Sequence, residues 1–221
     1  IATHDPLAVL LDVPEEGVEK RMSPCIHLFG CPEAGDTVTN IDVGGPITAS
    51  AVNVSSSLML SATGSNVTIW DTENARRVME MDHEAPVQAA AWSPNSQKVL
   101  TASGAELYVW DVNTRQLNRT LEHPGGADLV MWNADGTRFL SADQETVMIW
   151  DTLSWNAVGT IELDGARIAA AWNANGTLVM TASGSQVQLW NAFSGTLINT
   201  LDHDAPLTSA SFNPASTRIL T

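Results

Sequence analysis

The sequence predicts an all-β repeat protein made of four-stranded antiparallel sheets, and three observations support this fold class. Four tryptophans recur at a spacing of forty residues: Trp70, Trp110, Trp150 and Trp190. Each ends a short apolar run and is followed by Asp or Asn. Turn-forming residues separate these runs at regular intervals. A fixed period of about 40 residues that contains several strand-like runs is typical of repeat architectures.

The repeat divides most of the chain into units of equal length, because residues 41–221 align without insertion. The units are 41–80, 81–120, 121–160, 161–200 and the partial unit 201–221. In the second unit, the apolar runs predict strands at 87–92, 98–102, 106–110 and 116–121. The pairs Asp135-Gly136 and Asn175-Gly176 supply the positive φ angles of tight hairpin turns. Each unit is therefore expected to form one antiparallel sheet of four strands.

The composition indicates a folded and strongly acidic protein. Of the 221 residues, 44% are apolar and 16% are charged, which is unlike a disordered segment. The 25 acidic and 10 basic residues leave a net charge of -15. Such a surface repels phosphate groups, which disfavours nucleic acid and favours a basic protein or peptide as partner. No apolar run reaches the length of about 18 residues that a membrane span needs.

Several motifs of the repeat resemble those of the WD-repeat β-propeller family, in particular its regular, bacterial-looking members. They are the dipeptides Trp70-Asp71, Trp110-Asp111 and Trp150-Asp151, the upstream residues His83, His123 and His203, and the turn Trp92-Ser93-Pro94. The resemblance implies that each unit is a blade, with its first strand along a central channel and its fourth at the rim. It also implies that the recurring tryptophans, together with Trp92, Trp132 and Trp172 at the ends of first strands, fill the space between stacked sheets.

One feature departs from the family. Its blades often hold a hydrogen-bonded set of His, Ser or Thr, Asp and Trp, and here the Asp is missing from its usual place because the turns between second and third strands are short. Two units carry Val43 and Leu163 where the His would stand. We therefore expect the blades to depend mainly on packing for their stability.

Residues 1–40 are predicted to be a degenerate first blade, or an N-terminal extension that supplies closing strands. In the first case, residues 7–13 would be a first strand, 26–29 a third and 36–41 a fourth. About five and a half blades are then present, and the ring has to be closed. We expect a seven-bladed propeller with about 60 further residues, with two alternatives: closure as five blades, in which 26–29 and 36–41 complete the sheet begun by 207–220, and closure by another chain.

Candidate binding residues lie in the loops that the resemblance gathers on one face. These loops are rich in acids, and the predicted partner-binding residues are Asp82, Glu84, Glu122, Asp164, Asp202 and Asp204. Trp155, outside the recurring positions and expected early in a fourth strand, is predicted to contact a partner at the rim. The histidines have two interpretations, either as part of this docking surface or as internal hydrogen-bond partners.

The sequence predicts no catalytic residue, cofactor or metal site. Cys25 and Cys31 have only His27 close by, so they are expected to be reduced thiols or a short disulfide-closed loop. No Ser, His and Asp spacing recommends a triad. We conclude that the chain is a non-enzymatic interaction scaffold within a larger assembly. The alternative is a propeller module of a larger, secreted enzyme or sensor whose active part lies outside this sequence.

Overall fold

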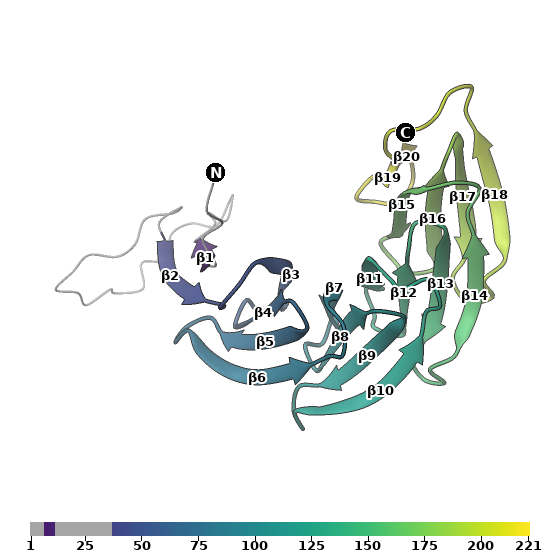
Figure 1. Cartoon of the computed structure of the whole chain (residues 1–221). Helices are drawn as coiled ribbons and strands as arrows, with labels where there is room; N and C mark the ends of the chain where they lie inside the picture. Colours follow the sequence, from purple (N-terminus) through teal and green to yellow (C-terminus); the bar gives the residue numbers. More distant parts are fainter. Residues whose placement is uncertain (1–6, 12–36) are drawn as a thin grey trace.

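A computed structural model of the chain describes residues 7–11 and 37–221 (Figure 1). All regular structure in this part is β-strand, and four antiparallel sheets have four strands each in sequential order. The predicted fold class, an all-β protein of four-stranded antiparallel blades consistent with a β-propeller, is confirmed.

The strands follow the predicted units closely. Blade 1 contains β3 (Ile47–Val52), β4 (Leu58–Thr63), β5 (Asn66–Asp71) and β6 (Arg76–Asp82). Blade 2 contains β7 (Val87–Trp92), β8 (Lys98–Ser103), β9 (Glu106–Asp111) and β10 (Gln116–Glu122). Blade 3 contains β11 (Leu129–Trp132), β12 (Arg138–Ala142), β13 (Thr146–Asp151) and β14 (Ala157–Glu162). Blade 4 contains β15 (Arg167–Trp172), β16 (Leu178–Ser183), β17 (Gln186–Asn191) and β18 (Leu197–Asp202).

Two smaller sheets flank the four blades. At one end, β19 (Ser211–Phe212) pairs with β20 (Ile219–Leu220), which corresponds to the partial unit. At the other end, β1 (Leu7–Leu11) pairs with β2 (Thr37–Asp42). The blades lie along an arc in which the first strands β3, β7, β11 and β15 form the inner side and the fourth strands form the outer side (Figure 1). This arrangement is the one that the WD-repeat resemblance implies.

The register of β1 corrects the prediction for the N-terminal unit. In blade 1, β5 pairs with β6 from Asn66↔Asp82, with a bulge between Ile69 and Trp70. The pair β1–β2 starts at Leu7↔Asp42 and has its bulge between Leu10 and Leu11. In both pairs the residue after the bulge lies four positions after the first paired residue. The segment 7–11 is therefore in the place of a third strand, not a first strand, and Leu11 stands where the other units have tryptophan.

The proposed closure within the chain is also corrected. Strand β2 pairs with β1, and β20 pairs with β19, so residues 36–41 do not complete the sheet begun by 207–220. The expected strand 26–29 lies outside the described residues, as do Cys25 and Cys31. Closure of the ring by further blades or by another chain stays a prediction.

The core lies between neighbouring sheets. The second and third strands of each blade carry the most buried side chains, such as Leu60, Val99 and Ile149, which have no exposed surface. One cluster joins blade 2 to blade 3 and contains Phe139 and Trp150. Their rings stack at 5.7 Å between centroids with planes 7° apart. The recurring tryptophans thus fill the space between sheets, as predicted, although Trp110 and Trp190 are only half-buried.

Candidate functional site

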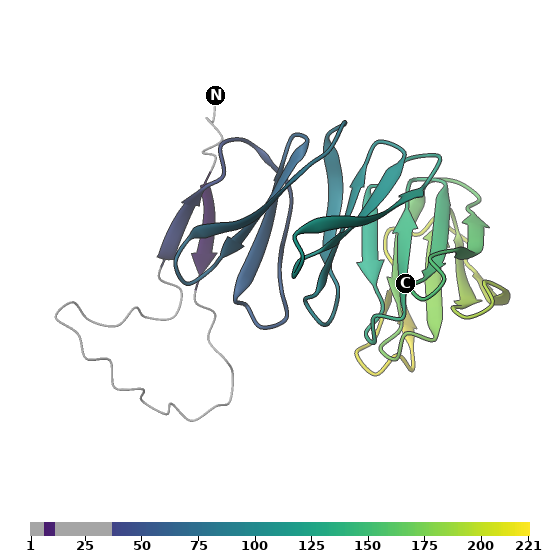
Figure 2. The same ribbon diagram turned by 90° about the horizontal axis from the view of Figure 1, so that it is seen from below.

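Two sets of loops meet at one end of the strands. The backbone N–H of His83 donates to Ser65 O at 2.9 Å, and that of His203 donates to Ser185 O at 2.9 Å. Each of these bonds joins the connection between a fourth and a first strand to the turn between a second and a third strand. Figure 2 shows the strands running between two opposite ends of the molecule. We call the end that carries these loops the acidic face, and the end that carries the turns after first and third strands the opposite face.

All six acids predicted to bind a partner lie on the acidic face and are exposed. They are Asp82, Glu84, Glu122, Asp164, Asp202 and Asp204. Two of them are fixed by their own blades, because Asp82 accepts a hydrogen bond from Asn66 Nδ2 and Asp202 accepts one from Gln186 Nε2, both at 2.8 Å. Two of the six exposed carboxylates are therefore held in position by their own blades.

The structure adds an ion pair that the sequence did not reveal. Arg167, at the start of β15, contacts the carboxylate of Asp128 and donates from Nε to the backbone oxygen of Asp143 at 2.8 Å. Asp128 and Arg167 are 39 residues apart, nearly one repeat, so their pairing follows from the docking of two neighbouring blades. This guanidinium neutralises part of the acidic face between blades 3 and 4.

A buried polar chain supports the acidic face in blade 3. His123 is fully buried, and its Nδ1 lies 2.8 Å from Ser141 Oγ. The same hydroxyl accepts a hydrogen bond from Trp150 Nε1 at 2.9 Å. The other imidazole nitrogen, Nε2, lies 3.4 Å from Asp143 Oδ2. Blade 3 therefore holds all four residue types of the family's polar set, with His123 Nε2 and Asp143 in a 3.4 Å contact that is not a hydrogen bond.

The prediction that the Asp is missing is therefore wrong for this blade. Asp143 lies in the short turn after β12 and is oriented by the backbone N–H groups of Glu145 and Thr146, at 2.7 and 2.6 Å. The sequence carries a signal for this: a Cβ at Gly125 would lie 1.8 Å from Asp143 Oδ2. Glycine at position 125, where blade 2 has Ala85, is what leaves room for the carboxylate.

The other blades keep only parts of the set. In blade 2, His83 Nε2 lies 2.7 Å from Thr101 Oγ1, which also accepts from Trp110 Nε1 at 3.1 Å. In blade 1, Trp70 donates to Ser61 at 2.8 Å. His203 Nε2 lies 2.9 Å from Thr221 Oγ1. The structure thus places His83 and His123 as internal hydrogen-bond partners, which is the second of the two interpretations above, whereas the hydrogen bond of His203 is exposed.

Burial of two histidines predicts a pH dependence of stability. Burial lowers the pKa of His83 and of His123 below the ordinary value of 6.5, and this effect is opposed only in part, mainly by backbone hydrogen bonds at His83 and by the Asp143 carboxylate at His123. As the pH falls through 6.5, the unfolded chain then binds more protons than the folded one. The folded state therefore becomes less stable as the pH decreases. We expect the urea midpoint to decrease from about pH 7 to about pH 5.5, well above the range where aspartates titrate.

Substitution of the two histidines tests this expectation. In a His83→Gln/His123→Gln variant, the midpoint should change less with pH over the same range, whatever the absolute loss of stability. An unchanged slope in the double variant would show that other groups cause the pH dependence.

The tryptophan predicted early in a fourth strand lies just before that strand, and its contact with a partner stays a prediction. Trp155 is in the turn before β14, on the opposite face, and is half-buried. Its ring packs 6.3 Å from Phe139, and Arg119 Cζ lies 5.7 Å from its centre. Trp155 therefore does not share a surface with the six acids.

The described residues 41–221 contain no cluster of three or more His, Cys, Asp or Glu side chains arranged to hold a metal ion. In the same part of the chain, no helix is long and apolar enough to cross a membrane.

The fold and its loop surfaces define a class of protein: a WD40-like β-propeller of the kind that fits protein interaction. A comparison with family models identifies the family more closely. The model described as "Eukaryotic translation initiation factor eIF2A" matches residues 47–205, which run from the first strand of blade 1 to the loop after blade 4. The chain belongs to this family. No curated protein matches the chain.

Proposed function

We propose that this chain is a non-enzymatic protein-interaction module that takes part in translation initiation and docks a basic protein partner on its acidic face. The family's description names a translation initiation factor, which supports the process. The observation that carries the docking surface is the set of six exposed carboxylates on one face. The alternative, a module of a larger enzyme or sensor, stays a prediction.

The charge of the chain supports a protein partner over RNA. A net charge of -15 repels a phosphate backbone, whereas it accelerates the approach of a basic protein. The acids belong to consecutive blades, with Glu84 at the start of blade 2, Glu122 at its end and Asp164 after blade 3. The partner is therefore proposed to lie across several blades rather than on one.

Charge reversal on the acidic face tests the docking surface. The triple variant Asp82→Lys, Glu122→Lys and Asp202→Lys should weaken capture of the partner by about tenfold at low salt, because it replaces steering attraction by repulsion. The measurement is a quantitative pull-down from cell extract at low and at moderate salt. Wild-type capture should decrease steeply with salt, and capture by the variant should depend on salt much less.

A matched control separates local charge from net charge. Glu73 is an exposed acid in the turn after β5, on the opposite face, so Glu73→Lys changes the net charge by the same amount as Glu122→Lys. We expect the first to leave capture unchanged and the second to weaken it. Equal effects of the two would mean that overall charge, not a docking surface, governs binding, and unchanged capture by the triple variant would refute the proposal.

A further inference from the structure

Two incomplete sheets lie at the two ends of the arc of blades (Figure 1). Strands β19 and β20 lie three repeats of forty residues after parts of β7 and β8, so they are a first and a second strand. Strands β1 and β2 stand in the places of a third and a fourth strand, as their register shows. One end of the arc therefore carries the first half of a blade, and the other end carries the second half.

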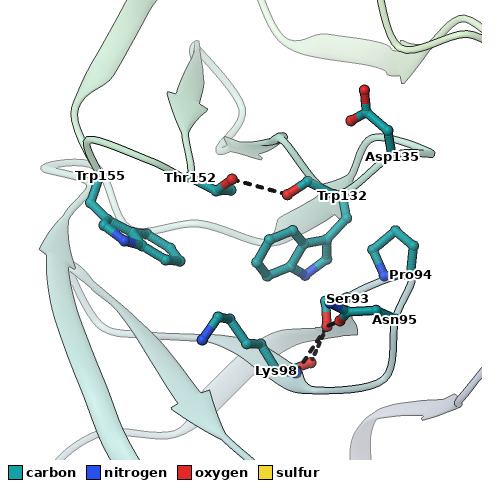
Figure 3. A pocket seen from close by; sticks show the side chains of 9 residues that line it. Ser93, Pro94, Asn95, Lys98, Trp132, Asp135, Thr152 and Trp155 are labelled. Atoms are coloured by element: carbon teal, nitrogen blue, oxygen red, sulfur yellow. Dashed lines mark hydrogen bonds between the residues drawn. The ribbon is translucent and has the colours of Figure 1, made fainter.

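The half blade β19–β20 is built like the same part of a complete blade. In blade 2, Ser93 Oγ accepts a hydrogen bond from the backbone N–H of Lys98 at 2.9 Å, within the turn between first and second strands (Figure 3). Asn213 Oδ1 accepts the same bond from the N–H of Arg218 at 2.9 Å. Residues of both strands also join an apolar cluster with blade 4. Strand β20 is therefore held in the position of a second strand.

Apolar side chains at this end lack the cover that their counterparts have. Leu220 in β20 is 73% exposed, whereas Leu100 is fully buried in a cluster with the next blade. Leu201 in β18 is 36% exposed, whereas Ile161 is 1% exposed and lies in a cluster with second- and third-strand side chains of blade 4. Both differences have the position and the size expected for a missing third strand and a missing next blade.

A hollow of about 210 Å³ lies beside β20 and blade 4. Its walls include Leu189, Leu201 and Ile219, which are side chains of core positions. The hollow between the complete blades 2 and 3 is of another kind, because it is formed largely by turns of the opposite face, with Trp132 and Trp155 in its wall (Figure 3). The hollow at β20 therefore belongs to the interior of an incomplete blade.

Blade 1 has the complementary deficiency. Strand β7 lies against β3 of the preceding blade, and Thr48 Oγ1 donates to Val87 O at 2.8 Å between them. In the described part of the chain, β3 has no first strand before it, and Ile47 is 38% exposed where its counterpart Val87 is buried. Strand β2 nevertheless occupies a fourth-strand place beside blade 1, because Ile41 is buried against Met59.

The two half blades also have free edges that match. Within residues 7–11 and 37–221, β1 pairs only with β2, and β20 pairs only with β19. The five residues of β1, Leu7–Leu11, are all apolar. An apolar strand with an unpaired edge is a template for pairing with another strand. Each of these edges is the one through which a complete blade joins its second strand to its third.

We propose that β20 of one copy of this chain pairs with β1 of a second copy, so that β19–β20 and β1–β2 together form a complete four-stranded blade. Strand β1 supplies the third strand beside Leu201, and β19 becomes the missing neighbour of β3 beside Ile47. Leu220 then lies against blade 1 of the second copy, as Leu100 lies against blade 3. Two different surfaces meet, so the copies add head to tail. This association uses sheet edges and is independent of the docking proposed above.

The register of the joint follows from the complete blades. In blade 2, Leu100 pairs with Val109, the residue before the tryptophan. Leu220 is the counterpart of Leu100, and Leu10 precedes Leu11 at the tryptophan position. Leu220 of one copy is therefore placed opposite Leu10 of the other. Opposed residues of an antiparallel pair have Cα atoms about 4.5–5.5 Å apart, which a disulfide can bridge.

A cysteine pair at this register tests the joint. Leu10→Cys and Leu220→Cys are introduced together in a Cys25→Ser/Cys31→Ser background, and the 221-residue protein is oxidised. Non-reducing electrophoresis and mass should show covalent dimers and longer oligomers. Leu10→Cys with Leu153→Cys, which is exposed on the opposite face, is the matched control and should stay monomeric. A disulfide within one chain would mean that the chain closes on itself and would overturn the proposal, as would a product no different from the control.

Sedimentation measures the association without a cross-link. Leu220→Lys should weaken self-association by at least about tenfold, because it puts a charge on the pairing edge, and Leu153→Lys should leave it unchanged. Val9→Lys should block the other edge. Each blocked variant keeps one intact edge, so a 1:1 mixture of the two should form dimers and stop there. A monomeric wild type, a Leu220→Lys variant that associates as tightly as the wild type, or a mixture without dimers would each refute the proposal. None of these outcomes bears on the acidic face.

Discussion

Replacement of Trp150 by alanine is expected to lower the free energy of unfolding by about 3–5 kcal/mol. The side chain is 5% exposed, stacks on Phe139, and donates its N–H to Ser141. Its removal leaves a cavity between blades 2 and 3 that the rigid neighbouring sheets cannot fill by collapse. Ser141 and His123 also lose a member of their buried polar chain. Urea unfolding of wild type and variant measures the difference.

Trp190→Ala is the matched control, because it removes the same side chain from the same position of blade 4. That indole donates to Thr181 at 2.9 Å, but it is only half-buried. The loss should therefore be clearly smaller than for Trp150→Ala. Trp150→Ala could instead lower the free energy of unfolding by less than about 1 kcal/mol, which is the range of ordinary surface substitutions and small repacking. That result would contradict the packing role of this ring.

The repeat made the fold predictable because every unit has the same pattern of strands and turns. The spacing of Trp70, Trp110 and Trp150 sets the register of every blade, and single ambiguous segments are resolved by their counterparts. The N-terminal strand shows where this fails. The apolar run that begins at Leu7 is predicted as a first strand, but its pairing with β2 places Leu11 at the tryptophan position. Without the tryptophan, the apolar run alone does not distinguish a first strand from a third.

The acidic loops were predictable for the same reason, since their place follows from blade topology alone. Contacts between blades could not be predicted from the sequence. They join residues about forty positions apart, and the side chains at these positions differ from unit to unit. Trp155 contacts Arg119, and at the same two positions one blade later Gly195 meets Gly159. The choice of residues at such a pair decides whether the blade boundary is closed by backbone contact or holds a hollow lined by an aromatic ring. Only the packed structure shows which.

The glycine pair at the boundary of blades 3 and 4 gives the second large effect. Gly195→Ala is expected to destabilise the protein by about 2–4 kcal/mol, the sum of a left-handed backbone cost and overpacking. The φ of Gly195 is +66°, and an added Cβ would lie 2.6 Å from Gly159 Cα and 2.6 Å from Val158 O. These are backbone atoms of β14, so the clash is relieved only by separating the two blades.

Two controls divide this loss into its causes. Gly64 has a φ of +57° and no atom within 4 Å of an added Cβ, so Gly64→Ala should cost only the backbone part, about 1 kcal/mol. Gly159→Ala places its Cβ 2.7 Å from Gly195 Cα. Because Gly159 does not have a left-handed φ, the cost of this substitution comes from overpacking alone. Ala75 already adopts a φ of +52° at the corresponding turn of blade 1. If Gly195→Ala costs no more than Gly64→Ala, the blades are free to separate at this boundary, and close backbone contact is not what holds blade 4 against blade 3.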